Sequence, residues 1–245
     1  MLKFTRMNSV LNKDYLEFSI GVFFSTAGFV FYYFTNRLVK RGHRLDSPDN
    51  PEDNSRKIIF QRLFGAFVFG VLPSVLFLIF SSRPMNEIGL TNFIPSHTLI
   101  MTLIAAIIIV PMNYFNARQP SNLNMYPQIR VRTWSPSLVI ASSLGWIVYL
   151  FAYELLFRGI LLFSSLDLMG FWPATILNAG IYSLVHIPKG AKESLGAIPM
   201  GILLCFLVVT TGSFWVAFFV HISLALTNEW FSLYHHPVIN VRSRT

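Results

Sequence analysis

The sequence predicts an all-α polytopic membrane protein, a bundle of about seven (6–8) transmembrane helices that forms a single membrane domain over residues 1–245. Two observations predict this fold. Hydrophobic residues make up 53% of the chain and charged residues only 12%, whereas soluble domains usually contain about 25% charged residues. The apolar residues also gather in stretches of about 20, the length of helix that crosses a bilayer.

Polar or turn residues bound each apolar stretch, which places the expected spans at residues 18–35, 58–80, 97–115, 136–167, 171–186, 194–210 and 213–231. Pro73 is expected to kink the second span, because proline removes a backbone hydrogen bond. Ser135 is the expected N-cap of the fourth, with Pro136 at its first helical position. That stretch is too long for one simple span, so it is either a long tilted helix or a short interfacial helix that leads into a span.

The charges of the loops predict the orientation. Basic residues are concentrated in alternate loops, at 36–57, 116–135 and 187–193, and in the C-terminal tail. The loops at 81–96, 168–171 and 211–213 carry one basic residue, Arg83. Since loops rich in Lys and Arg face the cytoplasm, we expect the basic loops there, in the cell (inner) membrane. Lys3, Arg6 and Lys13 favour the opposite orientation for the first span. Because the basic residues lie in the loops between spans, the net charge of +8 does not indicate nucleic acid. The expected partner is membrane lipid.

An ion pair inside an apolar span is the most informative local feature. Glu154 and Arg158 lie four residues apart, and Asp167 is the only other formally charged residue between Leu138 and His186. Four residues correspond to one helical turn, so the two side chains share a face and can pair. Ionisable residues in a span are costly and mark either a structural pair or a functional site. Both interpretations are open at this point.

Counting from the turns predicts which polar residues meet. Glu154 lies 16 residues before Gly170 and His186 lies 16 after it. At 1.5 Å per residue, each is about 24 Å from this turn, so the two share a depth near the cytoplasmic side. The other polar residues that these consecutive spans and their ends bring towards the same cavity are Arg158, Glu193, His221 and Asn228. A hydrogen-bonded helix end for His186 and a helix-start charge for Glu193 are the structural alternatives.

The order of three motifs carries a family resemblance. Glu154-x-x-x-Arg158-Gly is followed by Tyr182-x-x-x-His186 and then by His221 in the last span. Over about residues 125–232 this resembles the CAAX proteases and bacteriocin-processing enzymes, also called the Abi family of intramembrane proteases; residues 1–124 match only as generic spans. The resemblance implies an endopeptidase that cleaves a membrane-associated peptide or a prenylated C-terminus with water activated by a carboxylate and a histidine.

Two positions depart from the family pattern. Tyr153 stands where the family has the first Glu of its Glu-Glu-x-x-x-Arg motif, and Ala225 stands where its last motif has Asn. Asn228 lies one turn beyond Ala225. In such a variant branch the activating carboxylate is expected to be Glu154 or Glu193.

The alternative is a catalytically inactive member that acts as a membrane binding or immunity-type protein. No cofactor is firmly implied, and zinc or another divalent metal stays open.

Overall fold

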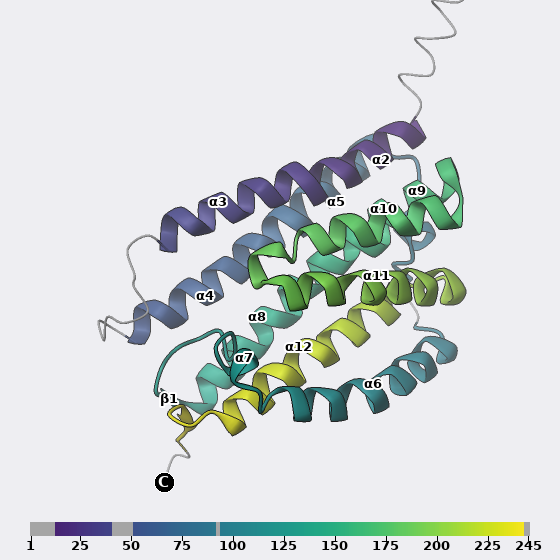
Figure 1. The fold of residues 1–245 in the computed structure, drawn as a ribbon. Helices are drawn as coiled ribbons and strands as arrows, with labels where there is room; N and C mark the ends of the chain where they lie inside the picture. The colour runs from purple at the N-terminus through teal and green to yellow at the C-terminus, as the bar shows by residue number, and fades with distance from the viewer. Residues whose placement is uncertain (1–12, 41–50, 92–93, 243–245) are drawn as a thin grey trace, which may run out of the picture.

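The protein is an all-α bundle, and its computed structural model describes residues 13–40, 51–91 and 94–242 (Figure 1). Among the described residues, the helical segments long and apolar enough to cross a membrane are Lys13–Leu38, Asn54–Phe80, Ser96–Asn116, Pro136–Met169, Ala191–Thr211 and Trp215–His235. A shorter helix, α10 (Phe171–Leu184), completes the bundle. The predicted fold class is thus confirmed. Lys3 and Arg6, which bear on the orientation, lie outside the described residues.

Each of the first two spans contains a π-helical turn. The first comprises α2 (Lys13–Phe23), η1 (Phe24–Gly28) and α3 (Phe29–Lys40). The second comprises α4 (Pro51–Ala66), η2 (Phe67–Val71) and α5 (Leu72–Phe80). The proline expected to distort the second span, Pro73, is the second residue after η2. A proline ring clashes with the carbonyl four residues earlier, here that of Phe69, and the wider π turn relieves this contact.

The segment between the second span and the fourth crosses the membrane once and then lies along one end of the bundle. Its elements are η3 (Met85–Ile88), α6 (Ser96–Asn116), α7 (Pro120–Leu123) and β1 (Thr133–Trp134). β1 pairs in parallel with β2 (Asn240–Val241), with Thr133 opposite Asn240. This pairing joins the start of the fourth span to the chain that leaves the last one.

The fourth span is one long helix, which decides between the two interpretations of this stretch. It consists of α8 (Pro136–Glu154), η4 (Leu155–Leu161) and α9 (Leu162–Met169). Ser135 caps it as predicted, since its Oγ accepts a hydrogen bond from the Leu138 amide at 3.2 Å. In the most apolar 18-residue stretch of this helix, 72% of the residues are buried, whereas 11% are buried in the corresponding stretch of α6. This helix is therefore the centre of the bundle, and it contacts α2, α4 and α12.

The chain after the central helix forms two hairpins. Gly170, at φ 76°, turns α9 into α10, and η5 (Ile187–Lys189) leads into α11 (Ala191–Thr211) and then α12 (Trp215–His235). The α9–α10 and α11–α12 turns lie at one end of the bundle, and the ends of α3 and α6 lie at the other (Figure 1). The described parts of the basic loops therefore share one end.

α10 is too short to cross a full bilayer. Its 14 residues extend about 21 Å, compared with about 30 Å of hydrocarbon. Starting from the Gly170 end, α10 stops short of the far ends of α4 and α8 (Figure 1). His186, two residues after α10, consequently lies within the bundle rather than at its surface.

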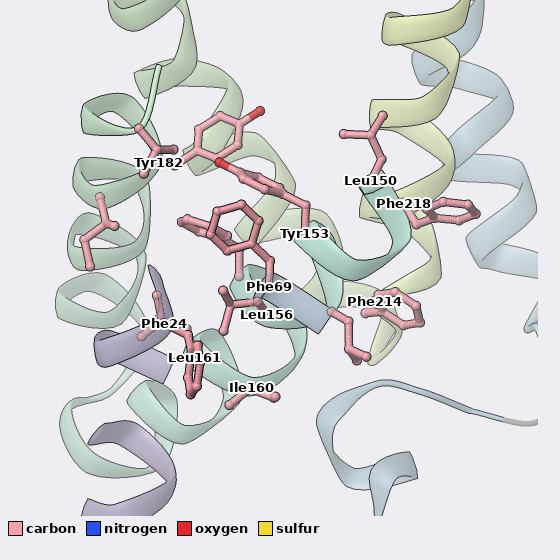
Figure 2. Packing of buried hydrophobic residues seen from close by; sticks show 14 of the residues in the cluster. Phe24, Phe69, Leu150, Tyr153, Leu156, Ile160, Leu161, Tyr182, Phe214 and Phe218 are labelled. Carbon is pink, nitrogen blue, oxygen red and sulfur yellow. The ribbon is translucent and has the colours of Figure 1, made fainter. Parts of the chain in front are cut away.

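The largest apolar cluster surrounds the π-helical part of the central helix. Phe69, Leu156, Ile160 and Leu161 pack together there (Figure 2). The three π-helical segments η1, η2 and η4, which come from three different spans, contact one another at this place. η2 also packs closely against α8, since a Cβ added at Gly70 would lie 2.6 Å from the Ala152 Cβ.

Gly70→Ala is therefore expected to destabilise the protein by about 1–3 kcal/mol, the usual effect of overpacking a core. Thermal unfolding in detergent measures this effect. Gly180→Ala is the matched control, because nothing lies within 4 Å of a Cβ at that helical position. Alanine favours a helix over glycine by about 1 kcal/mol, so the control should unfold at the same temperature or higher. Equal unfolding temperatures for both variants would contradict the close η2–α8 packing.

Candidate active site

Glu154 and Arg158 form the predicted ion pair at the centre of the bundle. Glu154 is the last residue of α8 and Arg158 lies in η4. Arg158 Nη1 is 3.3 Å from Glu154 Oε2, and both side chains are 0% exposed. π-helical turns occur often at functional sites, and here one contains the arginine of the pair. The pair is therefore a fully buried charge pair rather than a surface salt bridge.

His221 of α12 binds the other oxygen of the same carboxylate. Its Nδ1 lies 2.5 Å from Glu154 Oε1. An ionised carboxylate only accepts hydrogen bonds, so Nδ1 carries the proton in this pair. In the neutral ring, Nε2 then has a free lone pair. Glu154 thus fixes both the orientation of His221 and the nitrogen on which its proton resides.

Tyr182 of α10 connects His186 to this group. The Arg158 Cζ lies 4.2 Å from the centre of the Tyr182 ring, a cation–π contact. The Tyr182 carbonyl accepts a hydrogen bond from His186 Nδ1 at 2.7 Å, and the two rings lie 4.5 Å apart. His186 therefore also carries its proton on Nδ1. It contacts the cluster through Tyr182, whereas the sequence argument placed it at the same depth as Glu154 in a shared cavity.

An asparagine that the motifs do not include supports the π-helical segment. Asn178 of α10 is buried, and its Nδ2 donates to the Phe157 carbonyl at 2.6 Å. A π turn disturbs the regular hydrogen bonding of an α-helix, and a side-chain donor satisfies a carbonyl there. Asn178 therefore holds α10 against the segment that carries Arg158.

Among the described residues, no recorded hydrogen bond or ion pair joins Glu193 or Asn228, the other two predicted residues, to Glu154. Glu193 Oε2 is 3.6 Å from Lys189 Nζ and 3.5 Å from the Tyr126 hydroxyl, and the Glu193 side chain is 29% exposed. Asn228 is buried, and its position on α12 is about 10 Å beyond His221 along the helix axis. The recorded contacts thus join Glu154, Arg158, His221 and, through Tyr182, His186. This group is closed, because Glu154 and Arg158 are not exposed at all.

A second buried ion pair was not predicted. Arg62 of α4 lies 3.1 Å from Glu229 of α12, and both are nearly inaccessible. Trp146 Nε1 also donates to Glu229 at 2.9 Å, and Arg62 Nη1 donates to the Ser142 carbonyl at 2.7 Å. Three helices, α4, α8 and α12, are joined here. The sequence contains no local signal for this pair, because its partners are 167 residues apart.

The loop between α7 and β1 packs onto this second pair. Gln128 Oε1 accepts a hydrogen bond from Arg62 at 3.2 Å. Burial, and secondarily the nearby Glu193 carboxylate, raise the pKa of Tyr126 well above its usual value. Tyr126 is therefore a neutral hydrogen-bond donor between this loop and the start of α11.

A third charged group lies at the opposite end of the bundle. Arg83 Nη2 is 2.6 Å from Asp167, and Arg83 Nε is 3.3 Å from the buried Glu17. Arg83, the one basic residue of the loops at that end, thus ties the loop after α5 to α2 and α9. These contacts give Asp167 a structural role.

The described residues do not form a metal site. No group of three or more His, Cys, Asp or Glu side chains among residues 13–40, 51–91 and 94–242 is arranged to hold a metal ion. The nearest approach to one is Glu154 with His221, and their neighbour is the guanidinium of Arg158 rather than another ligand.

A bundle of apolar helices with a Glu–Arg–His group buried between the central helix and α12 defines an integral membrane protein with an intramembrane polar site. Residues 134–227 match the family described as type II CAAX prenyl endopeptidase Rce1-like. This match agrees with the resemblance seen in the motifs and supports, at the family level, a CAAX-type intramembrane protease. The match includes all four clustered residues and ends just before Asn228. No curated protein and no solved structure matches the chain.

Proposed function

We propose that the protein is an intramembrane endopeptidase of the CAAX type in which His221, oriented by Glu154, activates water. The single observation that carries this proposal is the 2.5 Å contact between His221 Nδ1 and Glu154 Oε1. A carboxylate that holds the Nδ1 proton of a histidine leaves Nε2 as a base and stabilises the imidazolium that forms. The substrate is a membrane-associated peptide or a prenylated C-terminus.

The reaction follows from this arrangement. The water oxygen attacks the scissile carbonyl carbon while the water proton passes to His221 Nε2. The C–N bond then breaks, and the same proton passes from Nε2 to the leaving amine nitrogen. Arg158 is a positioning residue, since its charge keeps Glu154 ionised and oriented. His186 also presents a free Nε2, which accepts a hydrogen bond from the attacking water.

The placement of Glu193 and Asn228 supports other roles for them. Glu193 is paired with Lys189 near the end of the bundle, so we assign the activating carboxylate to Glu154 alone. Asn228 is buried on α12, and its Oδ1 has no hydrogen-bond partner among the described residues, so we assign it no step of the reaction. The basic loops at that same end favour a cytoplasmic site in the cell (inner) membrane.

One observation favours a second function, that of an inactive membrane binding or immunity-type protein. Glu154 and Arg158 are completely buried, and Tyr153 occupies the place of the family's first Glu. A buried Glu–Arg pair that lacks the family's first Glu is also expected of a charge pair that only stabilises the fold. This second function predicts no cleavage by the wild type.

A cleavage assay separates the two functions. The purified protein in detergent is incubated with a labelled peptide library that includes prenylated C-terminal peptides. We expect the wild type to cleave at least one peptide and His221→Ala to lower kcat by at least about 10³-fold, because the base is lost. His97→Ala is the matched control, since His97 bonds the Thr211 carbonyl at the other end of the bundle. Cleavage that survives His221→Ala would refute the proposed mechanism.

A further inference from the structure

We propose that the hydroxyl group of Tyr153 donates a hydrogen bond to the scissile carbonyl oxygen as that oxygen gains negative charge. The proposal rests on the proposed function and adds a catalytic residue to it. Its starting observation is an unpaired group: Tyr153 is 4% exposed, and its hydroxyl has no hydrogen-bond partner in the described part of the chain. Leaving a buried donor unpaired costs about 1–3 kcal/mol.

The ring of Tyr153 packs among the residues of the cluster. The Tyr153 ring stacks on Phe157 at 4.5 Å and stands edge-on to His221 at 6.0 Å and to Tyr182 at 5.9 Å. Figure 2 shows the Tyr153 and Tyr182 side chains next to each other at one edge of the apolar cluster. Tyr153 therefore lies in contact with the ring of the proposed base and with the ring that covers Arg158.

The proposed chemistry needs a donor to the carbonyl oxygen, and the two histidines of the cluster do not provide one. In their neutral forms, His221 and His186 both carry the proton on Nδ1, where it is already bound to Glu154 and to the Tyr182 carbonyl. Their Nε2 atoms accept and do not donate. A phenol is protonated at neutral pH, so Tyr153, whose ring contacts that of His221, has a neutral donor in its hydroxyl.

This arrangement supplies what acyl transfer requires. The base must take a proton from water on one side, and a fixed donor must stabilise the charge on the carbonyl oxygen. His221 Nε2 has the first property and the Tyr153 hydroxyl the second. No proton leaves Tyr153: its O–H bond stays intact, and only the strength of its hydrogen bond changes as the oxygen becomes negative.

The substitution Tyr153→Phe tests this role, because it removes the hydroxyl and keeps the ring contacts. The probe is the library peptide that the wild type cleaves. We expect kcat to fall about 10²- to 10³-fold, as for loss of one oxyanion donor, with KM changed less than about twofold. The thermal unfolding temperature should stay the same or rise, because an unpaired hydroxyl is removed.

Tyr149→Phe is the matched control, since it makes the same change one helical turn earlier, in a residue that packs against Tyr32 and Trp146. Its kcat should equal that of the wild type. An unchanged kcat for Tyr153→Phe beside an inactive His221→Ala would overturn this inference and leave the proposed function intact. A loss of stability without a loss of kcat would show a structural hydroxyl and also overturn it. If the wild type cleaves no peptide, both proposals fall.

Discussion

Glu154→Gln is expected to lower kcat about 10⁴-fold, the effect of replacing the carboxylate that orients a catalytic histidine in well-studied hydrolases. The amide has the same shape, but its nitrogen can donate to His221 Nδ1 and thereby move the histidine proton to Nε2. The nitrogen that must accept the proton of water would then be blocked. KM should change much less than kcat, because the carboxylate does not touch the substrate. Activity is to be expressed per folded protein, because Arg158 also loses its partner.

Two further variants make this result specific. Glu87→Gln, at an exposed position in the turn η3 at the opposite end, is the matched control and should retain full activity. Glu193→Gln tests the competing carboxylate. If it removes activity while Glu154→Gln does not, the activating carboxylate is Glu193 and the mechanism proposed above is wrong.

Arg158→Met is expected to destabilise the protein by about 3–5 kcal/mol, because removal of one member of a buried pair leaves the other charge unpaired. Methionine is similar in length, so the loss reflects charge more than an empty volume. The Arg158 nitrogens make no hydrogen bonds within the described residues. Its stabilising contacts are the Glu154 carboxylate and the face of Tyr182. Thermal unfolding in detergent measures the effect.

A double variant tests whether the charge is the cause. Glu154→Gln combined with Arg158→Met removes both charges, and such a replacement of a buried pair is often close to neutral. The double variant should therefore unfold at a higher temperature than Arg158→Met. Arg118→Ala is the control for loss of an exposed arginine that lies over Tyr114, worth about 0.5–1 kcal/mol. An Arg158→Met variant as stable as this control would contradict a buried pair.

The sequence predicted those parts of the structure that local patterns determine. Apolar stretches of about 20 residues predicted the long spans, since a stretch of this length crosses a bilayer as an α-helix with its backbone hydrogen bonds made internally. The spacing of four residues predicted the Glu154–Arg158 pair, and Ser135 with Pro136 predicted the start of the central helix. All of these depend on residues close together in the chain.

The parts that the sequence did not predict depend on how distant helices rotate against each other. Glu154 and His186 lie equally far from Gly170 in the sequence, which predicted that they share a depth in the membrane. Such a count does not tell which way each side chain points around its helix. The histidine on the carboxylate is His221. The Arg62–Glu229 pair joins two helices far apart in sequence. The three π turns also have no sequence signal, because π and α turns use the same residue types.

Nuclear magnetic resonance of the histidine rings tests the central claim, that Glu154 holds the Nδ1 proton of His221, without any substrate. The protein is labelled with ¹⁵N-histidine in detergent, and the His221 signals are identified by their loss in His221→Ala. At neutral pH the account predicts a neutral His221 ring protonated on Nδ1, with that proton in a strong hydrogen bond. A His221 ring protonated on Nε2 with a free Nδ1 would contradict it.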